Sequence, residues 1–206
     1  MATEKQKLKR MTALTAIISL ISFIYKCGLG IYSMSLVLII ASLSTLMVFI
    51  CKVAFVKTVN KSRAAKKKSY LAMTIATLVY SLIFICFIVL KIFDIDISSQ
   101  KTYEGWLGIL LISFMVIMFV LSIIKLRGAL EKTDLMVIGL KEITFISALT
   151  DLVIIESFAY GVYLTYYETN EVLTRVNDFF PLGVSITMLL GVLIMFIRYS
   201  RYKVTK

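Results

Sequence analysis

The chain has 206 residues, 60% of them hydrophobic, a formal net charge of +11 and a mean hydropathy of +0.92. A water-soluble domain is only about half apolar, so this composition excludes an ordinary soluble fold. His is absent, which removes the commonest general base and the commonest transition-metal ligand. The three cysteines are odd in number and show no CxxC spacing, which favours neither a disulfide framework nor a zinc site. We therefore expect no enzyme activity, no cofactor and no bound metal.

Six apolar runs predict six transmembrane helices, because a helix rising about 1.5 Å per residue needs about 20 residues to cross roughly 30 Å of hydrocarbon. The runs lack the alternation of β-barrel strands, and a helix satisfies its own backbone hydrogen bonds. We expect an all-α fold, a polytopic integral membrane protein whose single membrane domain covers residues 1–206. The predicted helices span about 11–25, 31–55, 70–90, 105–124, 143–166 and 179–197.

The first two predicted helices are separated only by residues 26–30, with the sequence Lys-Cys-Gly-Leu-Gly. Glycine readily adopts positive φ, so Gly28 and Gly30 favour a tight turn here. We expect an antiparallel hairpin with Lys26 in its connection.

Orientation follows from the distribution of basic residues, because segments rich in Lys and Arg stay on the cytoplasmic side. Of the 23 Lys and Arg residues, only Lys26, Lys91, Lys101 and Arg175 fall on one side of the predicted membrane, which leaves nineteen on the other. Both termini are therefore predicted to be cytoplasmic. The connection between the second and third predicted helices is expected to contact anionic lipid headgroups through Lys57, Lys61, Arg63, Lys66, Lys67 and Lys68. We do not expect this basic segment to bind nucleic acid.

Short motifs are scattered over most of the chain. Phe23-Ile24-Tyr25-Lys26 precedes Gly30-Ile31-Tyr32, Tyr70-Leu71 opens the third predicted helix, and Gly139-Leu140-Lys141-Glu142 leads to Phe145-Ile146-Ser147-Ala148-Leu149. With these motifs the chain resembles a loose, uncharacterised group of small six-helix membrane proteins of low-GC Gram-positive bacteria. The resemblance implies a multi-pass protein of the bacterial inner (cytoplasmic) membrane, and it implies no activity and no site residues.

The fifth predicted helix carries two acids, Asp151 and Glu156, near the bilayer midplane. A charge there costs about 2.5–3.5 kcal/mol on insertion scales, so such residues usually serve an interior site. We interpret them as candidate ion- or proton-binding residues, supported by Thr144, Ser147 and Tyr160. They lie about 140° apart around a helix with 3.6 residues per turn, so one compact site requires a central or locally unwound helix. The alternative is that both acids only fix packing through hydrogen bonds to neighbouring hydroxyls.

Other polar residues of the predicted helices have more ordinary interpretations. Lys52 is the deepest basic residue of the second helix, and we expect Glu142 to lie at the inner interface and to pair with Lys52, with Lys141 and the basic loop as alternative partners. Small hydroxyl residues let helices approach closely, so we expect a packing role, with a polar pathway as the alternative, for Ser33, Ser35, Ser42, Ser44 and Thr45.

Three functional classes fit this sequence. The class that we favour is a small bacterial membrane transporter or channel for a cation or a small organic solute, because the chain carries carboxylates within its predicted membrane helices. The alternative is a non-catalytic protein that binds another membrane protein, such as an immunity, accessory or sensor subunit. A membrane-embedded enzyme fits least. A homo-oligomer or a membrane-protein partner is compatible with either of the first two classes.

Overall fold

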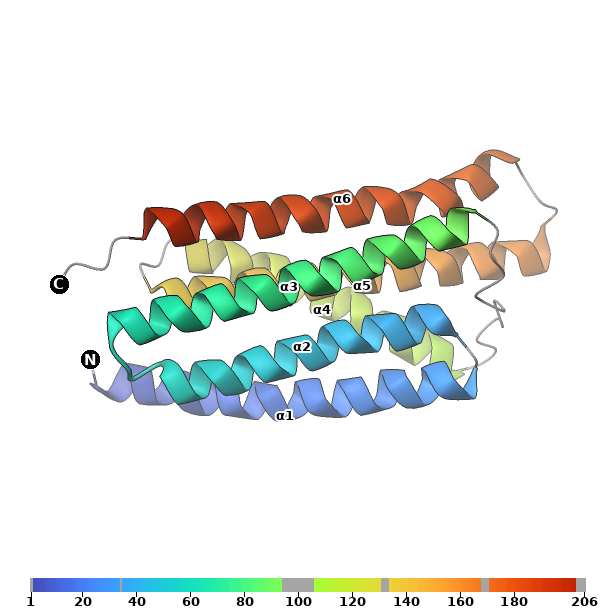
Figure 1. Ribbon diagram of the computed structural model, residues 1–206. Coiled ribbons are helices and arrows are strands. Elements are labelled where there is room, and N and C mark those ends of the chain that lie inside the picture. Colours follow the sequence, from blue (N-terminus) through green and yellow to red (C-terminus); the bar gives the residue numbers. More distant parts are fainter. Residues whose placement is uncertain (1, 34, 94–105, 131–133, 168–170, 203–206) are drawn as a thin grey trace.

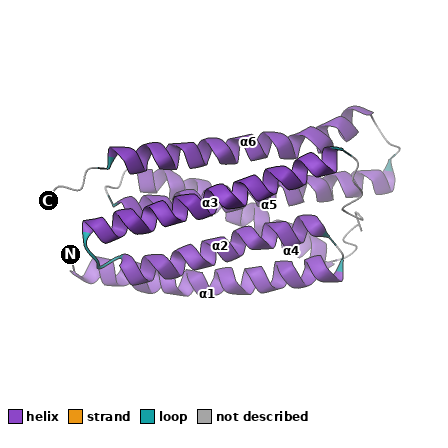
Figure 2. Cartoon of the chain, in the orientation of Figure 1, coloured by secondary structure: helices purple, strands orange, loops and turns teal. Residues whose placement is uncertain are grey.

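The computed structural model describes residues 2–33, 35–93, 106–130, 134–167 and 171–202, and every regular element within these ranges is a helix (Figure 2). The predicted all-α fold with six helices is confirmed. The helices are α1 (Ala2–Tyr32), α2 (Leu36–Thr58), α3 (Arg63–Ile92), α4 (Trp106–Leu130), α5 (Leu135–Tyr166) and α6 (Glu171–Arg201).

The helices form one elongated bundle around α5, with both termini at the same end (Figure 1). α5 packs against α2, α3, α4 and α6, whereas within the described residues the backbone of α1 comes close only to that of α2, and α1 reaches the other helices through side chains. α5 carries Lys141, Glu142, Asp151 and Glu156, so its ionisable side chains are surrounded by other helices. Within the described residues, five segments are long and apolar enough to cross a membrane, namely Gln6–Tyr32, Leu36–Thr58, Arg63–Ile92, Ile112–Leu130 and Glu171–Arg201.

The predicted turn at residues 26–30 is wrong, because α1 continues through it to Tyr32. A Cβ on Gly30 would lie 2.8 Å from Cγ1 of Ile39 and 3.0 Å from its backbone nitrogen. This glycine therefore allows α2 to approach α1 closely, and it does not make the turn. The chain reverses nearer Ser35, whose hydroxyl caps α2 by accepting from the N–H of Leu38. Lys26 consequently lies inside a helix.

Four helices, α1, α3, α5 and α6, begin earlier than the apolar runs predict, and two of them, α3 and α5, follow clear N-caps at the end of the bundle that holds both termini. α3 begins at Arg63, where the Ser62 hydroxyl accepts from the N–H of Ala65, and α5 begins after Asp134, whose carboxylate accepts from the N–H of Met136. Serine and aspartate are favoured N-caps because they satisfy otherwise unpaired backbone donors. At this end, α3 and α5 thus extend beyond the apolar segments.

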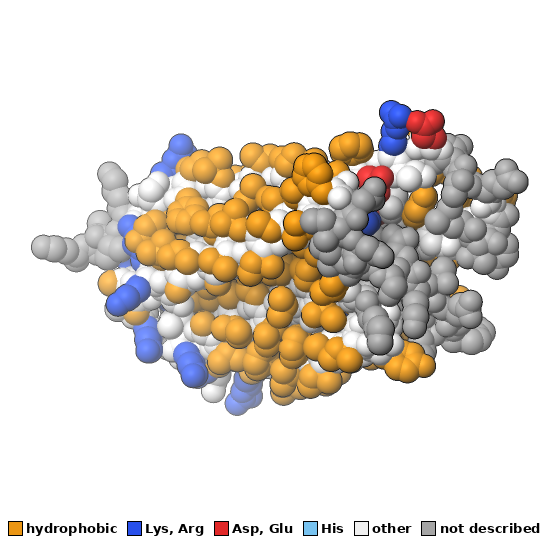
Figure 3. Space-filling model, turned by 45° about the vertical axis from the view of Figure 1, so that its right-hand side comes forward, with side chains coloured by type: hydrophobic (Ala, Val, Ile, Leu, Met, Phe, Trp, Pro, Cys, Tyr) orange, Lys and Arg blue, Asp and Glu red, His pale blue; other side chains and the backbone are white. Residues whose placement is uncertain are grey.

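We call the end of the bundle with both termini the basic end, because Lys57, Lys61, Arg63 and Lys68 are exposed there. On the face seen in Figure 3, Lys and Arg side chains gather at this end, and a broad band of hydrophobic side chains covers the middle. The opposite end is called the far end. This segregation of charge from apolar surface runs along the helix axes.

Two further lysines at the basic end contact other parts of the protein. Lys66 Nζ donates to Asp134 Oδ2 at 2.6 Å, and Lys67 Nζ donates to the Tyr202 carbonyl at 2.7 Å and lies 4.9 Å from the centre of the Tyr199 ring. They join the start of α3 to α5 and α6. These two predicted headgroup-binding lysines therefore already have partners within the chain.

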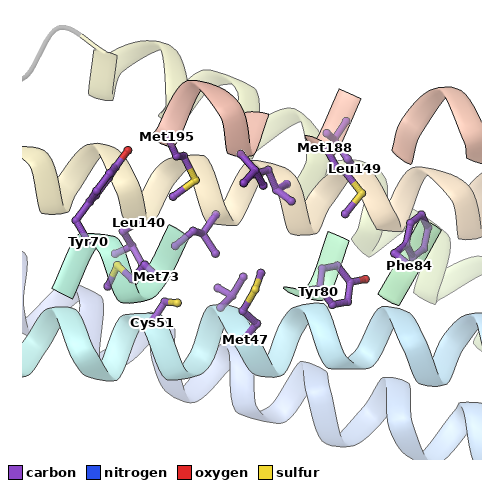
Figure 4. Packing of buried hydrophobic residues seen from close by; sticks show 14 of the residues in the cluster. Met47, Cys51, Tyr70, Met73, Tyr80, Phe84, Leu140, Leu149, Met188 and Met195 are labelled. Carbon is purple, nitrogen blue, oxygen red and sulfur yellow. The ribbon is translucent and has the colours of Figure 1, made fainter. Parts of the chain in front are cut away.

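The main hydrophobic core joins α2, α3, α5 and α6 (Figure 4). Its side chains interdigitate along the bundle axis, so burial of apolar area holds these four helices together. The labelled members are Met47, Cys51, Tyr70, Met73, Tyr80, Phe84, Leu140, Leu149, Met188 and Met195.

A smaller group of buried residues, here called the far-end cluster, joins α2, α4 and α5. It consists of Leu38, Ala41, Met115 and Ile154, which are each no more than 3% exposed. Leu29 of α1 packs against it. The far-end cluster therefore connects α1 and α4, the two helices at the margins of the bundle, to the centre.

Candidate functional site

A polar cleft of about 180 Å³ lies between α1 and α4, with α2 and α5 as its floor. Among the described residues α1 and α4 do not pack against each other, so the cleft separates them. We call it the lysine cleft. Its polar lining consists of seven hydroxyl residues, Thr12, Thr15, Ser19, Ser22, Thr45, Thr144 and Ser147, and five charged residues, Lys26, Lys52, Lys125, Lys141 and Asp151.

An ion pair between Lys26 and Asp151 ends the lysine cleft on the side of the far end. Lys26 Nζ donates to Asp151 Oδ1 at 2.6 Å and to Thr45 Oγ1 at 3.2 Å. Lys26 is 2% exposed and Asp151 is 6% exposed. Moving two charges out of water costs free energy, and their mutual attraction offsets that cost only when the two groups are in direct contact. Removal of one partner leaves the other as an uncompensated buried charge. The pair therefore ties α1 to α5 in the middle of the bundle.

The far-end cluster lies one helical turn beyond this ion pair. Leu29 follows Lys26 by three residues, and Ile154 follows Asp151 by three, which places each on the same helix face as the charged residue before it. Ala41 precedes Thr45 by four residues in α2, which runs in the opposite direction. The polar lining of the cleft is thus followed at once by a packed apolar layer from all four helices.

Lys52 lies near the basic end of the lysine cleft and is 8% exposed. Its Nζ donates to the Ser19 hydroxyl at 2.6 Å and to the Thr15 carbonyl at 2.9 Å. Both acceptors are uncharged, and no carboxylate in the described part of the chain forms an ion pair with Lys52. Lys141 and Lys125 instead act on it as like charges. A buried ammonium group without a counter-ion is costly, so this end of the cleft favours an anion.

Next to the floor of the cleft, small residues bring α2 and α5 together. The Ser44 hydroxyl lies 2.9 Å from Ser147 Oγ and 3.1 Å from Thr150 Oγ1. All three are buried, and small hydroxyl residues permit close helix approach. The hydroxyl residues of α2 thus divide between the two predicted roles, because Ser44 packs against α5 whereas Thr45 lines the cleft.

Glu142 has other partners than the predicted Lys52. Its carboxylate accepts a hydrogen bond from the Tyr70 hydroxyl at 2.9 Å and forms an ion pair with Arg198. Neighbouring residues on a helix differ by about 100° in direction, so Lys141 lines the cleft while Glu142 faces α3 and α6. The predicted pair is wrong because α5 separates the two side chains: Lys52 points to α1, on the other side of the bundle.

The other predicted site residues divide between two places. Thr144 and Ser147 line the lysine cleft with Asp151, whereas Glu156 does not. Glu156 is partly buried, its Oε2 atom has no hydrogen-bond partner in the described part of the chain, and Lys91 and Asp178 act on it electrostatically. Tyr160 instead contacts Thr174 of α6. The two acids therefore belong to no common site, as their angular separation indicates.

The contribution of α1 to the cleft was not predicted. Thr12, Thr15, Ser19, Ser22 and Lys26 follow one another at spacings of three, four, three and four residues. This spacing puts all five on one face of a helix. A polar stripe of that kind on an otherwise apolar helix is the signal that could have found the site from the sequence.

The described residues bring together no group of three or more side chains of the kinds that could hold a metal ion. What the lysine cleft offers instead is a set of ammonium and hydroxyl donors. Such donors bind carboxylate and phosphate oxygens through short, charge-assisted hydrogen bonds.

Comparisons with known proteins add no further information about this site. No family model, no curated protein and no solved structure matches the chain.

Proposed function

We propose that the chain is a multi-pass membrane protein with both termini and the basic end in the cytoplasm. Five helices of sufficient length and apolar character support membrane insertion, and α5 would cross the membrane inside the shell that they form. The exposed lysines and arginine of the basic end support this orientation. The resemblance to Gram-positive membrane proteins favours a bacterial cytoplasmic membrane.

Within that membrane, the protein is a transporter for a small organic solute, and the lysine cleft is its substrate site. The observation that carries this proposal is the asymmetry of the cleft. Its polar lining extends from the exposed Lys125 to the middle of the bundle, where the Lys26–Asp151 pair and the far-end cluster close it. A site that is open toward one side and sealed toward the other is one of the two states that alternating access requires.

Between the two solute classes that the sequence predicts, the geometry favours an organic solute over a cation. The four lysines and one aspartate of the cleft have a formal charge of +3, which repels cations. Asp151, the acid expected to bind a cation or proton, already accepts from Lys26. In this transporter the role of Asp151 is to keep the far end of the cleft closed through its ion pair with Lys26.

Thiol labelling tests alternating access. In a chain lacking Cys27, Cys51 and Cys86, the variant Ala41→Cys places a thiol in the far-end cluster and Thr144→Cys places one in the cleft. A membrane-impermeant methanethiosulfonate reagent should label Thr144→Cys from the cytoplasmic side. Ala41→Cys should react slowly from the outer side, because a transporter transiently opens there.

The non-catalytic alternative has one observation in its favour, which is that Lys26 and Asp151 satisfy each other. A protein that only binds another membrane protein has no need to open the far-end cluster. In that case Ala41→Cys stays unreactive from the outer side at all reagent concentrations at which Thr144→Cys is labelled completely from the inner side. That result would reject the transport proposal.

A further inference from the structure

Three lysines of the cleft lie at a common depth. Lys52 is six residues from the end of α2, Lys125 is five residues from the end of α4, and Lys141 is six residues after the start of α5. At about 1.5 Å per residue, each is roughly 9 Å inside the basic end. On the proposed topology this is the boundary between the cytoplasmic headgroups and the acyl chains.

The lining that lies deeper in the membrane is apolar along the margins of the cleft. Ile18 of α1 is 51% exposed and Phe114 of α4 is 38% exposed. Met118 lies between Phe114 and Lys125 along α4. Because the backbones of α1 and α4 do not come close together within the described residues, we infer that the cleft opens sideways between these apolar side chains. On the proposed topology that opening faces the lipid.

The cleft itself has room only for a small group. Its volume of about 180 Å³ corresponds to about six water molecules, at about 30 Å³ each. It is smaller than the roughly 300–1,000 Å³ of most drug-sized ligand sites. A phosphate or carboxylate group fits among the lysines and hydroxyls, and any long apolar chain attached to it has to remain at the apolar margin.

We propose that the lysine cleft binds the phosphate or carboxylate group of an anionic amphiphile that enters sideways from the cytoplasmic leaflet. Its head group lies between Lys52, Lys125 and Lys141, and its acyl chain extends past Met118, Phe114 and Ile18 toward the bilayer centre. This is the direction in which a lipid of that leaflet already points. The bound anion supplies the counter-ion that Lys52 lacks. The assignment rests on the proposed function for its topology, and it names the substrate class of the same site.

A binding experiment separates the head group from the chain. The purified full chain, in dodecyl maltoside, is titrated with dodecyl phosphate, with dodecylphosphocholine and with inorganic phosphate, and the midpoint of thermal unfolding is followed. Dodecyl phosphate should stabilise the protein at concentrations at least about tenfold lower than either of the other two, because only it combines a free anionic head with a chain.

Matched variants locate the two halves of the ligand. Lys52→Met should weaken dodecyl phosphate binding about tenfold or more, whereas Lys57→Met, which removes an exposed lysine from the same helix, should change it less than about twofold. Phe114→Ser should weaken dodecyl phosphate binding and leave that of inorganic phosphate unchanged. Ile117→Ser is its control, because Ile117 is exposed on α4 but does not line the cleft.

Several results would overturn the proposal. Equal binding of inorganic phosphate would identify a water-soluble anion, and equal binding of dodecylphosphocholine would show that charge is not recognised. Equal effects of Lys52→Met and Lys57→Met would show non-specific attraction. If Lys52→Met does not elute as a folded species, the comparison of Phe114→Ser with Ile117→Ser decides. Specific binding without outer labelling of Ala41→Cys would keep the ligand class and reject transport, so the two proposals fail separately.

Discussion

Lys26 and Asp151 are 125 residues apart in the chain, yet Nζ of one lies 2.6 Å from Oδ1 of the other inside the bundle. Replacing one partner leaves an uncompensated buried charge, so Lys26→Met and Asp151→Asn should each lower the free energy of unfolding by about 3–5 kcal/mol. The double variant Lys26→Met/Asp151→Asn should lose much less than the sum of the two single effects. Equilibrium unfolding in mixed micelles measures these losses. Additive effects in the double variant would show that the pair does not act as a unit.

The exposed pair of Glu171 and Arg175 provides the control. Their side chains are 79% and 72% exposed, and ion pairs of this kind contribute about 0.3–0.5 kcal/mol. Glu171→Gln should therefore leave the unfolding midpoint almost unchanged under the conditions in which Asp151→Asn shifts it.

The Tyr70 ring fills the space where a side chain of residue 139 would lie. A Cβ on Gly139 would come within 2.5 Å of Cε2 of this fully buried ring. Gly139→Ala should therefore destabilise the protein by about 1–3 kcal/mol, the usual cost of overpacking. Gly183→Ala is the matched control, because its Cβ meets no atom within 4 Å. A thermal unfolding midpoint as high for Gly139→Ala as for Gly183→Ala would contradict the packing described here.

Glu142 connects α5 to α3 and α6 through Tyr70 and Arg198. A double-mutant cycle of Glu142→Gln with Arg198→Gln should give a coupling energy of about 0.5–3 kcal/mol. The cycle of Glu142→Gln with Lys52→Met should give a value near zero, since Lys52 hydrogen-bonds to α1. The reverse order of the two coupling energies would favour the pair that the sequence predicts.

Glu156 and Asp151 should behave differently although they lie on one helix. Glu156 does not line the lysine cleft, so Glu156→Gln should change the affinity for dodecyl phosphate less than about twofold, the usual outcome for a residue without contact to the ligand. The unfolding free energy should change by less than about 1 kcal/mol, because Oε2 makes no hydrogen bond within the described residues that the substitution could remove. A loss of binding similar to that of Lys52→Met would place Glu156 in the site.

Reporter fusions test the topology. A reporter at the amino terminus, between residues 57 and 69, or at the carboxyl terminus should report a cytoplasmic location, because nineteen of the 23 basic residues are predicted to lie on that side. A fusion after Lys101 should report the opposite side. Cytoplasmic activity of the Lys101 fusion would reject six membrane crossings.

The number of helices could be predicted because each apolar run is about as long as a membrane is thick. The position of the turn between the first two helices could not be predicted, because Gly28 and Gly30 are compatible both with a turn and with close packing of two helices. In the structure Gly30 serves the second purpose, because Ile39 lies against it. Because the sequence predicts a turn at these glycines, it places Lys26 in a loop, whereas Lys26 lies in the interior as the partner of Asp151.

The site was only partly predictable for a related reason. Asp151 stands out because a charged residue is rare in an apolar helix, and Thr144 and Ser147 follow from their shared helix face. The anion-favouring character of the cleft depends on lysines from four different helices. No local pattern shows that they converge, because their arrangement is set by the packing of α1 and α4 on α2 and α5.

The far-end cluster also has an electrical consequence. On the proposed topology, water that enters the cleft would carry the cytoplasmic potential to the Lys26–Asp151 pair, and the voltage would then fall across the part of the bundle that begins with the apolar layer of Leu38, Ala41, Met115 and Ile154. A full charge that crosses this layer gains or loses about 2.3 kcal/mol per 100 mV. If the protein exports an anion as we propose, the inside-negative membrane potential of a cell would favour its release through this layer.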